Sequence, residues 1–219
     1  MAEPPGARQD LDRLAEAIVR GDRAAALDAT SAAIAAGAAP EAILDAATGG
    51  MGTVGDRFAC NEIYVPEMLI AARAMRASMT LLEPLLVDAG VAPLATAVIG
   101  TAKGDLHDIG KDLVATMWRA ARLEVVDLGS DVPPEAFVEA VREHGARIVG
   151  VSALLTTTMG GLREVVDAVR SADLPGVSVV VGGAPVTAEF AASIGADGTA
   201  ADAATAATLV RGMLGLAEA

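Results

Sequence analysis

The sequence predicts an α/β protein in which an N-terminal four-helix bundle precedes a doubly wound, five-stranded parallel sheet. Apolar residues in the first ninety positions repeat at helical spacing, in four stretches with short joins between them. After residue 90, short β-branched runs alternate with amphipathic stretches, and such βα units build a parallel sheet covered on both faces. We therefore expect a helical domain over residues 1–90 and an α/β domain over residues 91–219.

Four helices are expected in the first domain, and glycine or proline marks most of their ends. An apolar stripe identifies the first helix: Leu11, Leu14, Ile18 and Val19. Gly21-Asp22 is expected to end this helix and cap the next, which stops at Gly37. The third helix is expected from Pro40 to Phe58 and the fourth from Pro66 to Leu82. The fourth carries a core stripe of Met68, Leu69, Ala72, Met75, Met79 and Leu82.

The second domain begins after a linker, Asp88–Pro93, where the apolar pattern changes. The expected strands are Ala95–Ile99, Glu124–Leu128, Ile148–Ser152, Val177–Val181 and a weak fifth around Asp197–Ala200. The expected helices are 109–121, 134–144, 159–172, 187–194 and 203–217.

Composition and charge exclude several function classes. Aromatic residues are 2% of the chain, so stacking platforms for single-stranded nucleic acid are not expected. The net charge of −13, from 16 basic and 29 acidic residues, repels nucleic acid and anionic membranes. The start lacks a signal-peptide pattern, no apolar run could span a membrane, and a single Cys60 excludes an internal disulfide. We expect a cytoplasmic protein with no nucleic-acid or membrane partner.

Two glycine-containing stretches match nucleotide-binding motifs only in part. Gly50-Met-Gly52-Thr-Val-Gly55 has the letters of the dinucleotide fingerprint, but no strand precedes it, as the fingerprint requires. The stretch GDLHDIGKD, residues 104–112, approaches a phosphate loop, yet five residues separate Gly104 from Gly110-Lys111 where that motif has four. Neither stretch is expected to bind phosphate.

His107 lies in the GDLHDIGKD stretch, between the first expected strand of the sheet and the next helix. Ligands of open α/β sheets bind at this edge. Asp105 could accept a hydrogen bond from one ring nitrogen and make the other a better metal ligand. The alternative is structural: Asp105 or Asp108 caps the helix and His107 packs nearby. No second histidine or nearby cysteine completes a zinc site, so a metal on His107 would need ligands from a prosthetic group.

Hydroxyl-bearing and small residues follow the next two strands. Ser152-Ala-Leu154-Leu-Thr156-Thr-Thr158 follows the third strand, and Gly182-Gly183 follows the fourth. Parallel strands end at the same edge, so these stretches would share one rim with His107. They suit a long, slender polar group, which glycine allows the backbone to approach. The three stretches together favour a binding site over the structural alternative.

This combination resembles the cobalamin-binding domains with a DxHxxG…SxL…GG signature, which are flavodoxin-like (Rossmann-like) and hold the cofactor base-off, His-on. The resemblance implies that His107 is the lower axial ligand of cobalt, with Asp105 as its partner. It also implies an Asp105–His107–Thr158 relay, in which threonine replaces the serine of methionine synthase relatives.

The first domain is similar to the helical cap of corrinoid methyl carriers, the proteins of methanol, methylamine and aryl-methyl-ether systems. The implied capping residues over the upper corrin face are Met51, Val54, Phe58 and Val65. The implied cofactor contacts of the second domain are Gly104, Asp105, Leu106, His107, Asp108, Ile109, Gly110, Ser152, Leu154, Thr156, Thr158, Gly182, Gly183, Thr199, Ala200 and Ala203. The chain departs from the family at Thr199, where tyrosine is common, and in the cap at Cys60 and Tyr64.

The function that the resemblance implies is a methyl shuttle, carrying cobalamin as methylcobalamin or cob(I)alamin. Its implied partners are a substrate-specific methyltransferase, an acceptor methyltransferase and a reductive activator. The carrier would be non-catalytic by itself. The alternative function is a cobalamin- or light-sensing regulatory module, although 219 residues leave no room for the output domain that such sensors usually carry.

Overall fold

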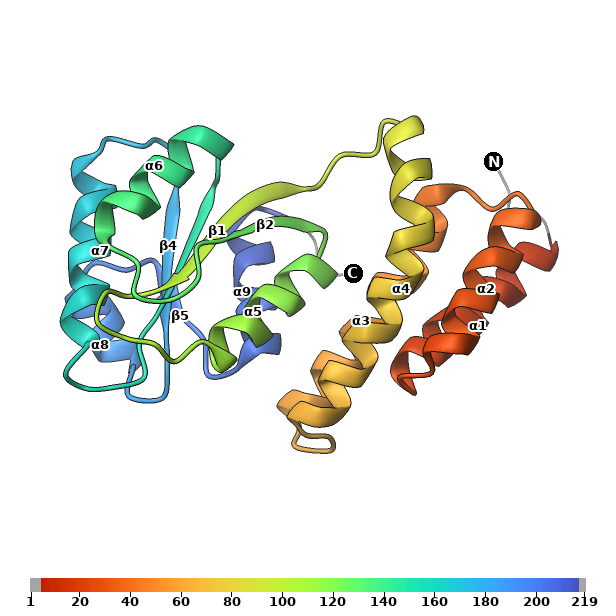
Figure 1. Ribbon diagram of the computed structural model, residues 1–219, viewed down its shortest axis with the longest axis horizontal. Coiled ribbons are helices and arrows are strands. Elements are labelled where there is room, and N and C mark those ends of the chain that lie inside the picture. The colour runs from red at the N-terminus through yellow and green to blue at the C-terminus, as the bar shows by residue number, and fades with distance from the viewer. Residues whose placement is uncertain (1–4, 217–219) are drawn as a thin grey trace. The chain divides into compact units, whose positions relative to one another are not determined.

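The computed structural model describes residues 5–216, and the chain divides between Ala92 and Pro93 into two compact units (Figure 1). The first unit consists of helices, and the second contains a five-stranded parallel sheet with helices. The fold class predicted from the sequence is therefore confirmed.

Four helices build the first unit: α1 (Pro5–Val19), α2 (Arg23–Ala35), α3 (Pro40–Ala59) and α4 (Val65–Asp88). α1 packs against α2 and α3, and α4 packs against the same two helices. Leu14 and Ile18 of the predicted stripe are fully buried. The α1–α2 turn also forms as expected, because Gly21 adopts a left-handed φ of 68° and Asp22 accepts a hydrogen bond from the Ala25 N–H.

The glycine pattern at residues 50–55 lies inside α3 and serves helix packing. A Cβ atom on Gly50 would lie 2.8 Å from the carbonyl oxygen of Ala15 in α1, so only glycine permits this close approach. A Cβ on Gly52 would meet nothing within 4 Å. As expected, this stretch is no dinucleotide-binding motif, because the strand and turn that the motif needs are replaced by continuous helix.

Two expectations for the fourth helix are wrong. α4 continues to Asp88 instead of ending at Leu82, so Asp88 belongs to the helix and not to the linker. The helix passes through Pro84, which lacks one backbone donor, because Leu82 and Leu86 are buried one turn apart and keep the same face packed. Leu69 is 39% exposed and lies outside the core stripe.

The second unit is doubly wound. Its strands are β1 (Ala95–Thr101), β2 (Leu123–Asp127), β3 (Ile148–Ser152), β4 (Ser178–Gly182) and β5 (Gly198–Thr199). Its helices are α5 (Ile109–Ala120), α6 (Pro134–His144), α7 (Met159–Ser171), α8 (Ala188–Ser193) and α9 (Ala203–Met213). The strand order is β2-β1-β3-β4-β5, all parallel, which is the flavodoxin-like order. α5 and α9 cover one face of the sheet, and α6, α7 and α8 cover the other (Figure 1).

Several expected boundaries shift by one to four residues. β1 runs on to Thr101, which is fully buried and pairs with Ser152 of β3. α9 ends at Met213, short of the expected residue 217, which lies outside the described residues. None of the helices within residues 5–216 is long and apolar enough to cross a lipid bilayer.

The core beneath α5 contains the single tryptophan of the sequence. Trp118 is 1% exposed, and its indole N–H donates to the carbonyl of Ala206 in α9 at 3.2 Å. A Cβ on Gly150 of β3 would lie 2.6 Å from the indole ring, so glycine makes room for the tryptophan against the sheet.

Candidate functional site

The predicted site residues of the second unit gather at the carboxyl edge of the sheet. In the register, Thr101, Ser152 and Gly182 align across β1, β3 and β4. The loop carrying His107 follows β1, and the loop ending at Thr158 follows β3. The topology thus places the three sequence stretches on one rim, as expected.

Asp105 and His107 form a hydrogen-bonded pair in the loop between β1 and α5. The Asp105 side chain is fully buried, whereas half of the His107 side chain is exposed. Oδ1 of Asp105 accepts from the His107 backbone N–H at 3.0 Å and lies 2.7 Å from Nδ1 of the ring. The aspartate therefore fixes both the loop backbone and the orientation of the imidazole.

The other carboxylate oxygen of Asp105 is held by the loop after β3. Oδ2 accepts from the Thr158 hydroxyl at 2.6 Å and from the Leu154 N–H at 2.8 Å. The structure thus brings Asp105, His107 and Thr158 together as one relay. The capping alternative is wrong, because α5 has Asp108 as its N-cap without a side-chain capping bond, and the Asp105 carboxylate is committed to His107 and the β3 loop.

These contacts lower the pKa of Asp105 well below its usual range. Burial by itself would raise this pKa, but hydrogen bonds from Thr158, from His107 and from the Leu154 N–H stabilise the charged form and outweigh burial. The carboxylate is therefore anionic at neutral pH and can accept a hydrogen bond from a proton on Nδ1 of His107. In that tautomer, Nε2 has the lone pair that a metal ligand requires.

The glycines of the site fall into two groups. Gly104 has a φ of 82° and Gly183 a φ of 130°, and a Cβ on Gly183 would collide with the carbonyl oxygen of Ala153. These two glycines are needed for the backbone itself. A Cβ on Gly110 or Gly182 would meet nothing within 4 Å, so these two border open space at the rim.

Exposed apolar residues lie in or next to the two loops of the relay, and a hydroxyl without a partner among the described residues lies on β5. The large apolar side chains beside it are exposed by 71% (Leu106), 73% (Ile109), 42% (Leu154) and 44% (Leu155). Exposed apolar residues in two adjacent loops are candidates for a binding surface. Oγ1 of Thr199 on β5 is buried and has no hydrogen-bond partner among the described residues. Ala203 is buried, Ala200 is half-buried and Thr156 is exposed.

Three polar residues near His107 were not identified from the sequence as parts of the site. Thr101, at the end of β1, contacts Ser152 Oγ at 3.0 Å and donates to the His107 carbonyl at 3.3 Å. Asp131 accepts from the Gly104 N–H at 2.7 Å. Lys111 is 3% exposed, and its Nζ lies 2.7 Å from both oxygens of Asp127. A buried hydroxyl at the end of an apolar strand could have revealed Thr101, whereas the other two contacts join distant segments.

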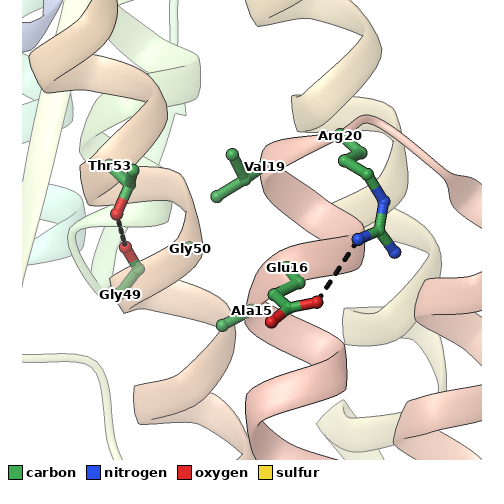
Figure 2. A pocket seen from close by; sticks show the side chains of 7 residues that line it. All are labelled: Ala15, Glu16, Val19, Arg20, Gly49, Gly50 and Thr53. Atoms are coloured by element: carbon green, nitrogen blue, oxygen red, sulfur yellow. Dashed lines mark hydrogen bonds and ion pairs between the residues drawn. The ribbon is translucent and has the colours of Figure 1, made fainter.

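The predicted capping residues lie in the helical unit. Met51 and Val54 are buried, and Phe58 and Val65 are half-buried. Their assignment to a corrin face stays a prediction. The helical unit also contains a hollow of about 300 Å³ between α1 and α3, which none of these four residues lines (Figure 2). Glu16 and Arg20 form an ion pair at its border, and the Thr53 hydroxyl donates to the Gly49 carbonyl.

Within residues 5–216, no group of three or more His, Cys, Asp or Glu side chains could hold a metal ion. Among these residues, His107 is paired with one carboxylate, that of Asp105. The family pattern described as "B12 binding domain" matches residues 95–208, and a second pattern with the same description matches residues 10–83.

The chain belongs to the B12-binding family.

Its relatives in this family include corrinoid proteins of similar length. "Trimethylamine corrinoid protein 2" of Methanosarcina acetivorans is 40% identical over 88% of this chain and 90% of the relative. "Dimethylamine corrinoid protein 3" of the same organism is 38% identical over 93% of this chain and 96% of the relative. B12-binding proteins of this type thus match the chain across both units.

Two solved structures share the fold of this family member. A cobalamin-binding protein from Desulfitobacterium hafniense DCB-2 has a TM-score of 0.78 and 32% identity, over 93% of this chain and 98% of that chain. A chain of the methanol:cobalamin methyltransferase complex MtaBC from Methanosarcina barkeri has a TM-score of 0.83 and 30% sequence identity. The match covers 97% of this chain and 81% of that chain. The bundle-plus-sheet architecture is therefore shared with cobalamin-binding structures.

Proposed function

We propose that this chain is a corrinoid methyl carrier that binds cobalamin base-off with His107 as the lower axial ligand. The observation that carries the proposal is the buried Asp105 carboxylate 2.7 Å from Nδ1 of a half-exposed histidine, at the carboxyl edge of a B12-binding sheet. Bound cobalamin supplies a cobalt ion that accepts a methyl group and gives it up again.

The described residues fit this cofactor. Asp105 fixes the tautomer of His107, so Nε2 is the nitrogen presented to cobalt. Exposed Leu106, Ile109 and Leu154 provide apolar surface for a large ring beside the histidine. The Thr158 hydroxyl supplies a hydrogen bond that keeps the Asp105 carboxylate charged beside His107.

The displaced nucleotide tail is proposed to lie along the rim toward β5. Gly110 and Gly182 leave open space, and the buried Oγ1 of Thr199 has no hydrogen-bond partner among the described residues. A buried hydroxyl without a hydrogen bond is unfavourable by about 1–3 kcal/mol, and a polar tail contact would offset this. Ser152, Thr156, Gly183, Ala200 and Ala203 complete the proposed lining, together with Gly104 and Asp108 at the loop.

The proposed partners are a substrate-specific methyltransferase, an acceptor methyltransferase and a reductive activator. Relatives named for trimethylamine and dimethylamine match at 40% and 38% identity, and the methanol system matches at 30%. An assay of methyl transfer should therefore offer methylated amines and methanol side by side. Met51, Val54, Phe58 and Val65 are proposed as the apolar cap that shields the upper corrin face. A cytoplasmic location is part of this proposal, in keeping with Cys60 as a free thiol.

The ligand assignment is tested by loading the protein with cob(II)alamin and recording its electron paramagnetic resonance spectrum. A nitrogen ligand splits the cobalt lines into triplets. Labelling histidine with ¹⁵N should turn the triplets into doublets if a histidine ligates the cobalt. His107→Ala should remove this splitting, while the control His144→Ala, at the exposed end of α6, should leave it unchanged. Triplets that persist despite ¹⁵N-histidine would refute the base-off, His-on assignment.

A further inference from the structure

The loop between β1 and α5, which carries Asp105 and His107, is hydrogen-bonded to a segment that follows β2. The Gly104 N–H donates to Oδ1 of Asp131 at 2.7 Å, and the Asp131 N–H donates to the carbonyl of Asp105 at 3.0 Å. Asp131 thus bonds to both residues of the Gly104–Asp105 dipeptide, one bond through its side chain and one through its backbone. We name these two hydrogen bonds the Asp131 clamp.

The conformation of Asp131 is itself unusual. Its φ is 57°, in the left-handed region that residues other than glycine seldom adopt, although aspartate tolerates it better than most. This conformation has a cost that surrounding contacts must offset. The flanking backbone supplies them, since the Thr101 N–H donates to Gly129 at 2.9 Å and the Val132 N–H donates to Thr101 at 3.0 Å. The backbone on both sides of Asp131 is therefore hydrogen-bonded to the end of β1.

The loop on the other side of the clamp needs such a support. Gly104 has a φ of 82° and no side chain, so by itself it allows many backbone conformations. The residue after it, Asp105, sets the position of the His107 ring through a 2.7 Å contact. A small rotation at Gly104 would displace the Asp105 carboxylate and the imidazole together. A fixed charged acceptor on the Gly104 N–H opposes that rotation.

Core packing does not account for the Asp131 side chain, because the residue is exposed. Its carboxylate contact also joins positions 27 residues apart in sequence, so it is no local turn contact. We infer that Asp131 is a positioning residue: the Asp131 clamp holds the Asp105–His107 pair in the geometry that presents Nε2 to cobalt. The cobalt step of this inference rests on the proposed function; the geometric step does not.

The test uses three variants of the full-length protein. Asp131→Gly keeps the left-handed backbone without strain and removes the carboxylate. Asp131→Asn keeps an acceptor oxygen and tolerates the same conformation. Asp173→Gly is the control, because Asp173 also has a positive φ, of 50°, and lies between α7 and β4. Comparison with this control removes the general effect of introducing glycine at such a position.

The first measurement needs no cofactor. Nuclear magnetic resonance of the ¹⁵N-histidine-labelled protein reports how fast the Nδ1 proton of His107 exchanges with solvent. We expect about fivefold faster exchange in Asp131→Gly, the effect of losing one net hydrogen bond, near wild-type exchange in Asp131→Asn, and no change in Asp173→Gly. Equal exchange in wild type and Asp131→Gly would overturn the inference.

The second measurement is the fraction of cob(II)alamin that shows a histidine nitrogen ligand in the loaded protein. We expect Asp131→Gly to shift the ratio of ligated to unligated cobalt about fivefold toward the unligated form, with rescue by Asp131→Asn. An unchanged ratio in Asp131→Gly would contradict the inference. If His107→Ala retains the nitrogen splitting, the proposed function fails, and the cofactor-free measurement still decides on the clamp.

Discussion

The two units bury polar side chains in different ways. Among residues 5–216, the buried polar or charged residues are Thr30 and Ser78 in the helical unit and Thr101, Asp105 and Lys111 in the α/β unit. Thr30 donates to the Ala26 carbonyl at 2.8 Å and Ser78 to the Ala74 carbonyl at 3.4 Å, each four residues back in its own helix. These hydroxyls are satisfied wherever a helix forms.

Buried polar groups of the α/β unit depend instead on the tertiary fold. Asp105 accepts from Leu154 and Thr158, which are 49 and 53 residues away, and Thr101 meets Ser152 across 51 residues. Lys111 reaches Asp127 across 16 residues. The Asp105 contacts join two loops at the carboxyl edge, whereas the Thr101 and Lys111 contacts join neighbouring strands and a helix to its strand. The Asp105 contacts are lost if either loop moves, so they specify where these loops lie. The helical unit stabilises itself by local contacts, whereas the α/β unit uses polar burial to shape a site.

The largest effect should come from breaking the ion pair of the buried Lys111. Lys111→Met removes its hydrogen bonds to the Asp127 carboxylate, which lies at the surface, and losing such charged hydrogen bonds should lower the free energy of unfolding by about 3 kcal/mol. Chemical denaturation measures this loss. The control is Lys103→Met, an exposed lysine whose removal should change stability by less than about 0.5 kcal/mol. Equal effects of the two variants would show that this polar burial is unimportant.

The pH dependence of that difference sharpens the test. Burial raises the pKa of Asp127, but the Lys111 hydrogen bond outweighs it, so the folded-state pKa is lowered and stability is lost as the pH falls through it. Burial lowers the pKa of Lys111, but its hydrogen bonds to Asp112 and Asp127 raise it above the ordinary value, so stability is lost at strongly alkaline pH. The difference between wild type and Lys111→Met should stay constant from about pH 5 to about pH 10 and shrink below about pH 4. Denaturation curves across this range would contradict the pairing if the difference grew in acid.

A smaller difference in stability is expected between hydroxyls that bond to a distant residue and hydroxyls that bond within their own helix. Thr158→Val removes a 2.6 Å bond to a charged carboxylate and should lower the free energy of unfolding by about 2 kcal/mol. Thr30→Val removes a bond within one helix turn and should lower it by about 0.5 kcal/mol. Thermal and denaturant unfolding of both variants provide the comparison. If Thr30→Val proved the more damaging, the contrast between local and long-range contacts would be wrong.

The smallest effects concern packing in the helical unit, where a glycine allows two helices to approach closely. Gly50→Ala should lower the free energy of unfolding by about 1 kcal/mol, because the clash with Ala15 exceeds the gain in helix propensity. Gly52→Ala, in the same helix with nothing within 4 Å, should raise it by about 0.5–1 kcal/mol. Opposite signs are the expected result, and two stabilising substitutions would contradict the close crossing of α1 and α3.

Patterns that lie close together in the sequence were predictable. β-branched runs predict the strands, and the two-residue spacing of Asp105 and His107 suggests their contact, although by itself this spacing leaves the capping alternative open. Thr158 could be joined to them only through the family resemblance, because 53 residues separate it from Asp105. The clamp by Asp131 depends on how two loops meet in three dimensions, and the pairing of Lys111 with Asp127 depends on how α5 packs beside β2; no local spacing encodes either contact.

Local signals also misled where tertiary packing competes with them. Pro84 favours a helix end, but burial of Leu86 one turn after Leu82 keeps α4 intact to Asp88. Leu69 matches the helical spacing of the core stripe and is nevertheless 39% exposed. Lys111 occupies the lysine position of an incomplete phosphate-binding motif, whereas the structure buries it in α5, where it pairs with Asp112 and Asp127.

The position of Trp118 makes the α/β unit optically separate from the helical unit. The indole is buried between the sheet and α9, and the sequence holds no other tryptophan. Its fluorescence therefore reports the unfolding of the sheet unit, while circular dichroism follows the helices of both units. Two unfolding curves that separate would reveal that the units melt independently, and a corrin ring bound at the carboxyl edge should quench the same emission by energy transfer.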